Sequence, residues 1–412
     1  MIKKAFLFPG QGVQNVGMGK TLCENFKVAS DVFDEASNSL GFDMKKMCFT
    51  SSLEELTLTE NAQPAILTVS YAMYQVCMEE MGIKADIMAG HSLGEISALT
   101  CAGAIQFKDA VKIAKKRGKF MQEAVKPGEG MMAAVQVRDI NKIREVCSEL
   151  SSKNEIVSIS NYNTGIQTVI AGSKSGVSKA MDMLEKEGIK STQLNVSAPF
   201  HCPLMKPAAE LFEEEIGKYQ FKELNCEVLS NVTGLPYASK EDIPNNLVQQ
   251  IISPVQWVAS MKYLKRSMVR YCIELGPKNV LKTMMKKNIA DIPVFSFDNE
   301  EEIETAKHYI KKTYVPFLSR TMGIAVATKN NNYNPEEYKE GVVKPYKQVQ
   351  SLQEKIESEN REATREEMEV GIEMLKKVFH TKKVSDEEKK ERFKQLFNET
   401  GTEEIFTGFS IE

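Results

Sequence analysis

Hydrophobic and polar positions in the first 125 residues alternate between two periods, which predict strands and helices in turn. Strands are expected over 5–8 and 85–89, and helices over 53–81, 95–104 and 108–125. The first strand stops at Pro9-Gly10-Gln11-Gly12 and a loop follows, whereas the second runs straight into Gly90-His91-Ser92-Leu93-Gly94. This alternation is typical of an α/β domain with a parallel sheet.

The middle of the chain has a different order of elements. Strands are expected over 131–137, 156–161, 168–172 and 191–196, and helices over 140–150 and 177–188. The order βαββαβ is the signature of a ferredoxin-like unit. The α/β pattern resumes with a strand over 226–230, a helix over 261–268 and a strand over 271–274. We therefore interpret residues 129–197 as a subdomain inserted into a larger domain made of residues 1–128 and 198–300.

Residues 301–412 predict a charged, mostly helical C-terminal extension. From Ser351 to Glu412 there are 16 acidic and 11 basic residues and no Pro, Cys or Trp. An apolar stripe at helical spacing is formed by Leu352, Ile356, Met368, Ile372, Leu375 and Phe379. We favour a solvated helical appendage with a partly buried face over a dedicated recognition module, and both interpretations stay open.

Composition and charge narrow the class of protein. The chain has 412 residues, of which 42% are hydrophobic and 26% charged, as expected of a globular protein with more than one folding unit. The net charge of −3 provides no global positive field, so we expect neither nucleic acid nor a membrane as partner. The apolar run before Pro9 is too short for a secretory or membrane segment. The eight cysteines form no Cys-x-x-Cys, which favours reduced thiols, no metal site and a cytoplasmic location.

Ser92 is the candidate nucleophile. It occupies the centre of a G-x-S-x-G sequence between a predicted strand and a predicted helix. A sharp turn there directs the serine outward, and the next amide and the helix N-terminus can stabilise a developing oxyanion. The alternative is a purely structural turn.

His201 is the candidate base, since a serine hydroxyl needs one to take its proton. Of the four histidines, His308 and His380 lie outside the α/β region, and the His91 side chain should point away from its neighbour on a tight turn. His201 follows directly after the inserted segment. A lone histidine can equally be a buried structural residue, but elimination favours His201.

Arg117 lies on the apolar face of its predicted helix, unlike the neighbouring lysines. A buried guanidinium needs an anion, which is either an internal carboxylate or the carboxylate of a substrate held by two parallel hydrogen bonds. A dinucleotide loop is discounted because Asn15 occupies the third glycine position of G-x-G-x-x-G. The chain has no phosphate-binding lysine motif and no histidine or cysteine cluster with metal spacing.

Together these residues resemble the malonyl-CoA:acyl-carrier-protein transacylases, in order and in spacing, over residues 1–300. The principal motifs are Gly10-Gln-Gly-Val-Gln14, Gly90-His-Ser-Leu-Gly94, Arg117, Pro199-Phe-His-Cys-Pro203 and Glu274-Leu-Gly-Pro277. Further hallmarks are Asn61-Ala-Gln-Pro-Ala65, Asn161-Tyr-Asn-Thr, Val169-Ile-Ala-Gly172, Ser230-Asn-Val-Thr-Gly234 and Gln250 before Ser253-Pro-Val-Gln-Trp257.

The resemblance implies an α/β-hydrolase-like core that carries the ferredoxin-like insertion. It implies that Ser92 is acylated with His201 as base, that the amides of Gln11 and Leu93 form the oxyanion hole, and that Arg117 binds the malonyl carboxylate. The main-chain carbonyl of Gln250 would orient the histidine in place of a triad acid.

The implied reaction transfers a malonyl group from malonyl-CoA to the phosphopantetheine thiol of an acyl carrier protein, with no further cofactor. Phe200 resembles the malonyl-selective form of its motif, because a bulky ring leaves little room for a 2-methyl group. Val13 and Cys202 replace serines that are usual in the family, which affects loop packing rather than chemistry. Fatty-acid synthesis and polyketide synthase modules both remain open as the destination.

A basic stretch is the candidate docking surface for the acidic carrier protein. Residues 261–287 contain eight basic residues and one acid, Glu274. Opposite potentials speed encounter, although an ordinary solvated face would have the same composition.

Three other functions are less consistent with these residues. An acyl hydrolase that clears misloaded carrier proteins of a polyketide synthase has little need of the Arg117 clamp. An ordinary esterase would need a triad acid and a lid, and an inactive scaffold would not need Ser92 and His201.

Overall fold

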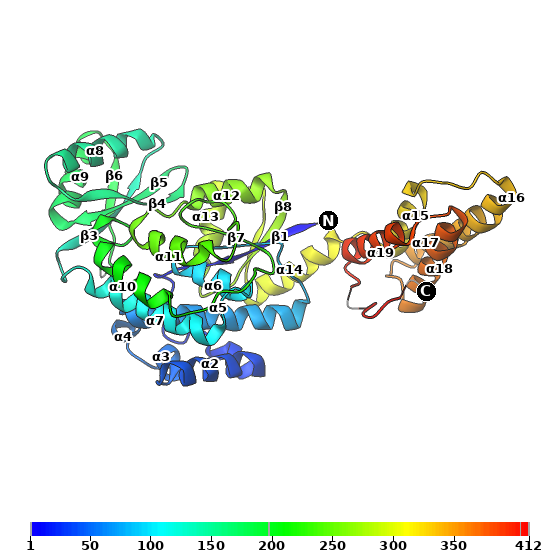
Figure 1. Ribbon diagram of the computed structural model, residues 1–412, viewed down its shortest axis with the longest axis horizontal. Helices are drawn as coiled ribbons and strands as arrows, with labels where there is room; N and C mark the ends of the chain where they lie inside the picture. The colour runs from blue at the N-terminus through cyan, green and yellow to red at the C-terminus, as the bar shows by residue number, and fades with distance from the viewer. Residues whose placement is uncertain (1, 197, 404, 411–412) are drawn as a thin grey trace. The chain divides into compact units, whose positions relative to one another are not determined.

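Five parallel strands form the central sheet of the computed structural model, which describes residues 2–196, 198–403 and 405–410 (Figure 1). Their order across the sheet is β7 (Glu227–Leu229), β2 (Ile87–Gly90), β1 (Lys3–Phe8), β8 (Val269–Glu274) and β9 (Val294–Ser296). In the middle strand, Leu7 pairs with Ala89 on one side and with Glu274 on the other. The predicted α/β class with a parallel sheet is therefore confirmed.

Helices cover both faces of this sheet, because successive side chains of a strand point to opposite sides. Ala5 and Leu7 of β1 pack in one cluster with residues of α12 (Trp257–Arg266) and α13 (Val280–Asn288). Phe6 points the other way, and its ring contacts Tyr74 of α5. The helices on that face are α5 (Thr59–Met81), α6 (Leu93–Cys101) and α7 (Phe107–Glu123).

A second, antiparallel sheet lies within residues 130–193. Its strands, in order across the sheet, are β4 (Val157–Thr164), β5 (Gln167–Ser173), β3 (Gly130–Gln136) and β6 (Lys190–Gln193). The helices that accompany it are α8 (Ile140–Ser152) and α9 (Lys174–Lys186). Val135, Ile143, Ile170 and Val177 belong to the apolar cluster shared by this sheet and its helices. The chain then returns to the larger sheet at β7 through α10 (Lys206–Ile216), and α11 (Asp242–Ile252) follows β7.

The sequence pattern predicts a loop after Gly12, and this prediction is wrong for much of the segment. Three helices lie there: α1 (Lys20–Asn25), α2 (Lys27–Leu40) and α3 (Met44–Phe49). The second buries Ala29, Val32, Phe33 and Ala36, which have the spacing of one helix face. The helix expected over 53–81 is two helices, α4 (Leu53–Thr57) and α5, because Leu58 between them has an extended ψ of 129°.

The chain divides into two compact units, Lys3–Glu304 and a smaller one formed by Thr305–Glu412 with the first two residues. The helices after residue 299 are α14 (Glu300–Thr313), α15 (Phe317–Ala327), α16 (Pro335–Tyr338), the π-helix η2 (Lys339–Val343), α17 (Lys344–Ser358), α18 (Arg365–Thr381) and α19 (Asp386–Thr400).

The smaller unit has an apolar core of its own, which is more than the partly buried face that we favoured from the sequence. Four of the six residues in the predicted stripe are buried in it: Ile356, Ile372, Leu375 and Phe379. The other two pack against it. Thr364 begins α18 with a capping box, which explains why the pattern is interrupted between α17 and α18. Among the described residues, a search for a helix long and apolar enough to cross a membrane found none.

Candidate active site

Ser92 lies on the sharp turn between β2 and α6. Its φ of 53° and ψ of −110° are unusual for a residue other than glycine, and such strain is typical of functional sites. The flanking glycines are required by space: a Cβ on Gly90 would lie 1.8 Å from backbone atoms of Gly94, and a Cβ on Gly94 would lie 2.0 Å from the carbonyl oxygen of Phe8. The Asn231 side chain clamps the turn by accepting from the Ser92 N–H and donating to the Gly90 carbonyl, both at 2.7 Å.

His201 connects the nucleophile to a helix end. Its Nε2 is 2.7 Å from Ser92 Oγ, and its Nδ1 is 2.7 Å from the main-chain oxygen of Gln250. Gln250 is in the last turn of α11, where carbonyls have no partner within the helix. A carbonyl only accepts, so Nδ1 carries the proton and Nε2 is left to accept from the serine hydroxyl.

The environment of His201 keeps its ring neutral. Burial, followed by the nearby charge of Arg117, lowers the pKa of His201 to about 3, against the raising effect of the hydrogen bond to Gln250. At neutral pH the imidazole is therefore in the form that can take a proton.

Arg117 projects from α7 into the same place and is 1% exposed. Its Nη1 donates to Gln63 Oε1 at 2.8 Å, and its Nη2 donates to Gln250 Oε1 at 2.6 Å and to Ser92 Oγ at 3.2 Å. Its Nε is buried without a hydrogen-bond partner in the described chain. Burial lowers the pKa of Arg117 to about 10, although the charge of Glu95 raises it, so the guanidinium stays charged at neutral pH.

No carboxylate of the described residues lies within ion-pair distance of Arg117. The internal carboxylate that we considered from the sequence is therefore not a direct partner. A buried cation with unused donors beside a serine hydroxyl is suited to bind an anionic group of a ligand.

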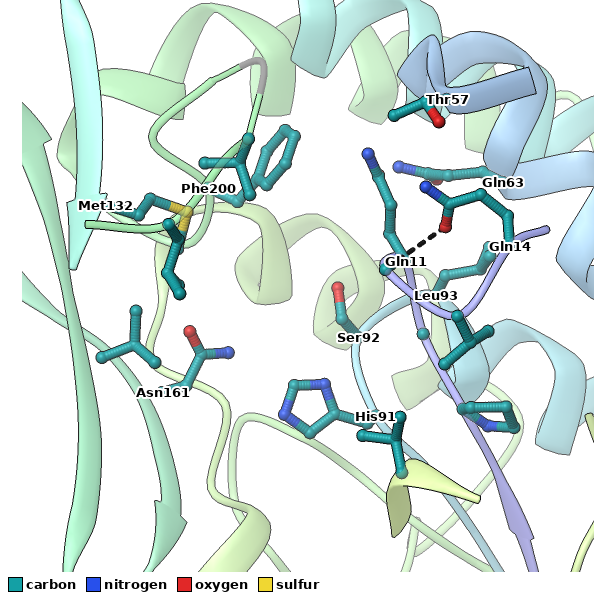
Figure 2. A pocket seen from close by; sticks show the side chains of 18 of the residues that line it. Gln11, Gln14, Thr57, Gln63, His91, Ser92, Leu93, Met132, Asn161 and Phe200 are labelled. Atoms are coloured by element: carbon teal, nitrogen blue, oxygen red, sulfur yellow. Dashed lines mark hydrogen bonds between the residues drawn. The ribbon is translucent and has the colours of Figure 1, made fainter. Parts of the chain in front are cut away.

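Gln11 and Leu93 line the pocket on the same side of the nucleophile (Figure 2). Leu93 is the first residue of α6, and N–H groups in the first turn of a helix have no partner within it. The loop of Gln11 is held by the side chain of Gln14, which accepts from the Gly12 N–H at 2.7 Å, and by a hydrogen bond from the Gln11 side chain to Thr59 Oγ1 at 3.3 Å. The structure brings both residues to Ser92, while their role as oxyanion hole stays a prediction.

These side chains surround one cavity of about 650 Å³. Figure 2 shows Phe200, Met132 and Asn161 on the side opposite to Gln11, with the Ser92 hydroxyl between the two sides. Phe200 is buried. One wall of the cavity therefore comes from the loops and helices around the parallel sheet. The other wall comes from β3, β4 and the segment before His201.

His91 is the neighbour of the nucleophile, but its ring has other partners. Its Nε2 is 2.9 Å from Asn163 Oδ1, and its ring meets Trp257 edge-on at 5.5 Å between centroids. Cys202, after the base, is buried and donates its thiol to the Pro199 carbonyl at 3.0 Å. All the cysteines are free thiols. No cluster of three His, Cys, Asp or Glu suitable for a metal ion occurs among the described residues.

Four residues of the site have no role in the sequence reasoning: Gln63, Glu95, Asn231 and Tyr237. Gln63 and Asn231 lie in stretches that carry the resemblance, but nothing in their spacing says what they bind. Glu95 offered the strongest signal in the sequence, because it is the one charged residue of the helix expected over 95–104.

Comparisons with known proteins agree with this geometry. The acyl transferase domain family model matches residues 5–326. A malonyl CoA-acyl carrier protein transacylase of Bacillus subtilis is 38% identical over 390 residues, which cover 92% of this chain and 96% of that protein. The crystal structure of a malonyl CoA-acyl carrier protein transacylase from Clostridium perfringens superposes with a TM-score of 0.73 at 39% identity, covering 75% of this chain and 98% of that one.

A further solved structure is a malonyl-transacylase in complex with a type II PKS acyl-carrier protein. It has a TM-score of 0.72 and 37% identity, and the match covers 74% of this chain and 99% of that one. The two solved structures therefore match about three quarters of the chain, whereas the alignment with the B. subtilis relative extends well into the smaller helical unit.

Proposed function

Because the chain belongs to the acyl transferase family and, within it, to the malonyl CoA-acyl carrier protein transacylases, we propose that it transfers malonyl groups from malonyl-CoA to an acyl carrier protein. The acceptor is the phosphopantetheine thiol of the carrier. The observation that carries this proposal is the arrangement around Ser92 Oγ, which lies 2.7 Å from a neutral imidazole and 3.2 Å from a buried guanidinium. The first suits acyl transfer, and the second suits an acyl group that ends in a carboxylate.

The first half-reaction loads the enzyme. Ser92 Oγ attacks the thioester carbonyl of malonyl-CoA while His201 Nε2 takes the hydroxyl proton. The oxyanion that forms accepts hydrogen bonds from the N–H groups of Gln11 and Leu93. Each of these donors lowers the activation barrier by on the order of 3 kcal/mol. The carbon–sulfur bond then breaks, His201 returns the proton to the departing CoA sulfur, and a malonyl ester remains on Ser92.

The second half-reaction repeats these steps in reverse. His201 takes the proton of the carrier thiol, the sulfur attacks the ester, and the proton returns to Ser92 Oγ as the thioester leaves. The main-chain carbonyl of Gln250 holds the ring in one tautomer throughout, as an acid does in a Ser-His-Asp triad. Apart from CoA and phosphopantetheine, which are part of the substrates, these steps use no cofactor.

Arg117 is the proposed clamp for the malonyl carboxylate. Its Nη2 already faces Ser92 Oγ, so the carboxylate of a bound ester can accept from it, and the buried, unpaired Nε becomes a second donor when the guanidinium turns toward that carboxylate. An ester held in this way is fixed relative to the attacking thiol, which favours transfer over hydrolysis.

Phe200 is proposed to disfavour a methyl group on C2 of the acyl chain. It is buried at the cavity wall next to His201. One methyl group in a pocket changes the discrimination between two substrates by about 1–3 kcal/mol. Phe200→Ala should therefore raise the rate with methylmalonyl-CoA relative to malonyl-CoA by about tenfold or more. An unchanged ratio in competition assays with both thioesters would contradict this role.

The carrier is proposed to dock beside α13, since Val280, Leu281 and Met284 of this helix border the cavity. Not every basic residue of the 261–287 stretch is available to bind the carrier. Lys282 pairs with Glu302 at 2.6 Å and Lys265 with Asp291 at 3.3 Å, so acids from outside the stretch neutralise part of it.

Lys286 and Lys287 are exposed near the end of α13 and are the better candidates for docking. Replacing both by Glu should slow transfer to the carrier and reduce its dependence on salt, while the loading of Ser92 by malonyl-CoA stays unchanged. Carrier kinetics with the wild-type salt dependence would rule this surface out.

We also infer the finer architecture and the location. The antiparallel order β4–β5–β3–β6 with two helices supports a ferredoxin-like inserted subdomain at 129–197. The strand–serine–helix turn supports an α/β-hydrolase-like core at 1–128 and 198–300, with a helical extension at 301–412. The free thiols support a cytoplasmic protein.

The experiment that tests the function is intact-protein mass spectrometry after incubation with malonyl-CoA, followed by a panel of acyl carrier proteins. The wild type should gain one malonyl group, Ser92→Ala none, and His201→Ala should load far more slowly. Adding the correct carrier should move the group to its phosphopantetheine. Release of free malonate in place of transfer would indicate the hydrolase, and the absence of any ester would refute both.

A further inference from the structure

Glu95 lies directly beneath the nucleophile turn, in the first turn of α6, and its side chain is fully buried. Its Oε2 accepts from Gln250 Nε2 at 2.6 Å, and its Oε1 accepts from the Tyr237 hydroxyl. The backbone N–H of Asn231 is a third donor. An acceptor-only group with four lone-pair sites is therefore surrounded by donors, which a carboxylate satisfies and an amide does not.

The side-chain amide of Gln250 connects this carboxylate to Arg117. Its Oε1 accepts from Arg117 Nη2 at 2.6 Å, and its Nε2 donates to Glu95 and, at 3.0 Å, to the Ser92 carbonyl. A guanidinium only donates and a carboxylate only accepts, so the charges on its two sides fix which way the amide faces.

The two charges interact although they do not touch. Burial raises the pKa of Glu95 to about 7, and the hydrogen bonds from Tyr237, Gln250 and Asn231 and the charge of Arg117 oppose this effect. Glu95 in turn raises the pKa of Arg117. Glu95 is thus the internal counter-charge of the Arg117 guanidinium, and the side-chain amide of Gln250 lies between the two charged groups.

That distance has a chemical consequence. A carboxylate paired directly with Arg117 would occupy two of its donors and compete with a carboxylate of the substrate. With the amide in between, Glu95 orients Nη2 and leaves Nε without a partner in the described chain. Burying an anion costs folding free energy, and an apolar side chain would fill the same space at least as stably. A purely structural role therefore does not explain a carboxylate at this position.

We propose that Glu95 is a positioning residue for malonyl transfer, which acts through the Gln250 amide to hold Arg117 beside Ser92. This rests on the proposed function, since it assumes that Arg117 receives the carboxylate of the acyl group. Glu95 also bonds to the residue whose main-chain oxygen orients His201, but the effect on Arg117 is what separates it from a structural residue.

The test compares two thioesters that differ only in the carboxylate. Rates of Ser92 acylation by malonyl-CoA and by acetyl-CoA are measured by intact-protein mass spectrometry for the full-length wild type, Glu95→Gln, Glu95→Asp and Tyr237→Phe. We expect Glu95→Gln to lower the malonyl rate relative to the acetyl rate by about tenfold or more, as the loss of an oriented charged contact predicts. Glu95→Asp keeps the charge and should recover part of this ratio.

Tyr237→Phe is the matched control, because it removes one donor to Glu95 and leaves the Gln250 contact in place. Because that donor lowers the pKa of Glu95, the two ratios are compared at alkaline pH, where Glu95 is ionised in both proteins, and the ratio of Tyr237→Phe should there stay within about twofold of the wild type. If Glu95→Gln does not fold, Gln250→Met cuts the same connection and leaves the main-chain oxygen for His201, so it should show the same malonyl-specific loss.

Equal losses with both thioesters in Glu95→Gln, or a wild-type ratio in Gln250→Met, would overturn the proposal and leave Glu95 with a structural role. A wild-type protein that forms no malonyl ester would instead refute the proposed function. The two failures are therefore distinguishable.

Discussion

Arg117→Ala should abolish most of the preference for malonyl over acetyl groups. The guanidinium is buried, lies 3.2 Å from the nucleophile and has an unpaired Nε. A malonyl carboxylate that accepts from Nη2 and Nε gains two charge-assisted hydrogen bonds, and an acetyl group gains neither.

The size of the effect follows from those two bonds. A hydrogen bond to a charged group contributes about 1.5–3 kcal/mol, and truncating one partner of a buried charge pair costs about 2–5 kcal/mol. A combined loss of about 3–4 kcal/mol corresponds to a decrease of roughly 10²–10³ in kcat/KM for malonyl-CoA. Acetyl-CoA loading should fall much less than malonyl-CoA loading, because no contact to an acetyl group is removed and the loss of the Arg117 charge raises the pKa of His201.

The assay is single-turnover acylation of Ser92, with each thioester in turn and with a thermal denaturation curve for each variant. Lys116→Ala is the control, since it removes an exposed positive charge from the adjacent position on α7. A malonyl-to-acetyl ratio that Arg117→Ala leaves unchanged would refute the clamp, whatever the effect on the overall rate.

Three further predictions concern titration and stability. Acetyl-CoA loading should show no acid limb near pH 6.5, because the folded pKa of His201 is about 3 and the base stays neutral above it. The malonyl-to-acetyl ratio should fall as pH drops through about 7, where Glu95, facing Tyr237 and Arg117, gains a proton, and this step should be absent in Glu95→Gln. Lys382→Met should destabilise the smaller unit by about 1–3 kcal/mol, measured by hydrogen exchange in α15 of the full chain, because buried Lys382 donates to two carbonyls at the end of that helix.

Local patterns were enough to predict the parts of the site that depend on neighbours in sequence. The turn at Ser92 follows from an apolar strand, two glycines and a helix start, and the inward direction of Arg117 follows from helical period. His201 was reached by elimination among four histidines and by the resemblance of its motif, not by a periodic pattern. The amphipathic pattern of α2 was present in the sequence and was overlooked, whereas α1 and α3 have only six residues each, too few to show a helical period.

The supporting network could not be predicted in this way, because its bonds join distant parts of the chain. Ser92 and Asn231 are 139 positions apart, and Gln250 and Glu95 are 155 apart. No periodicity relates such pairs, and only the packing of α11 and the β7 loop against α6 brings them together. The single acid in an otherwise uncharged predicted helix was the available signal, and it indicates that Glu95 has a partner without showing which residue that is.

The charge proposed to recognise the substrate also sets the strength of the base. After burial, Arg117 has the largest lowering effect on the pKa of His201. A malonyl carboxylate paired with Arg117 cancels much of that positive charge, so the pKa of His201 should rise when the correct acyl group is bound. An acetyl group leaves the base weak. The carboxylate then contributes to the step in which Ser92 loses its proton, and not only to binding, so discrimination between the two thioesters should appear in the rate of ester formation more than in KM.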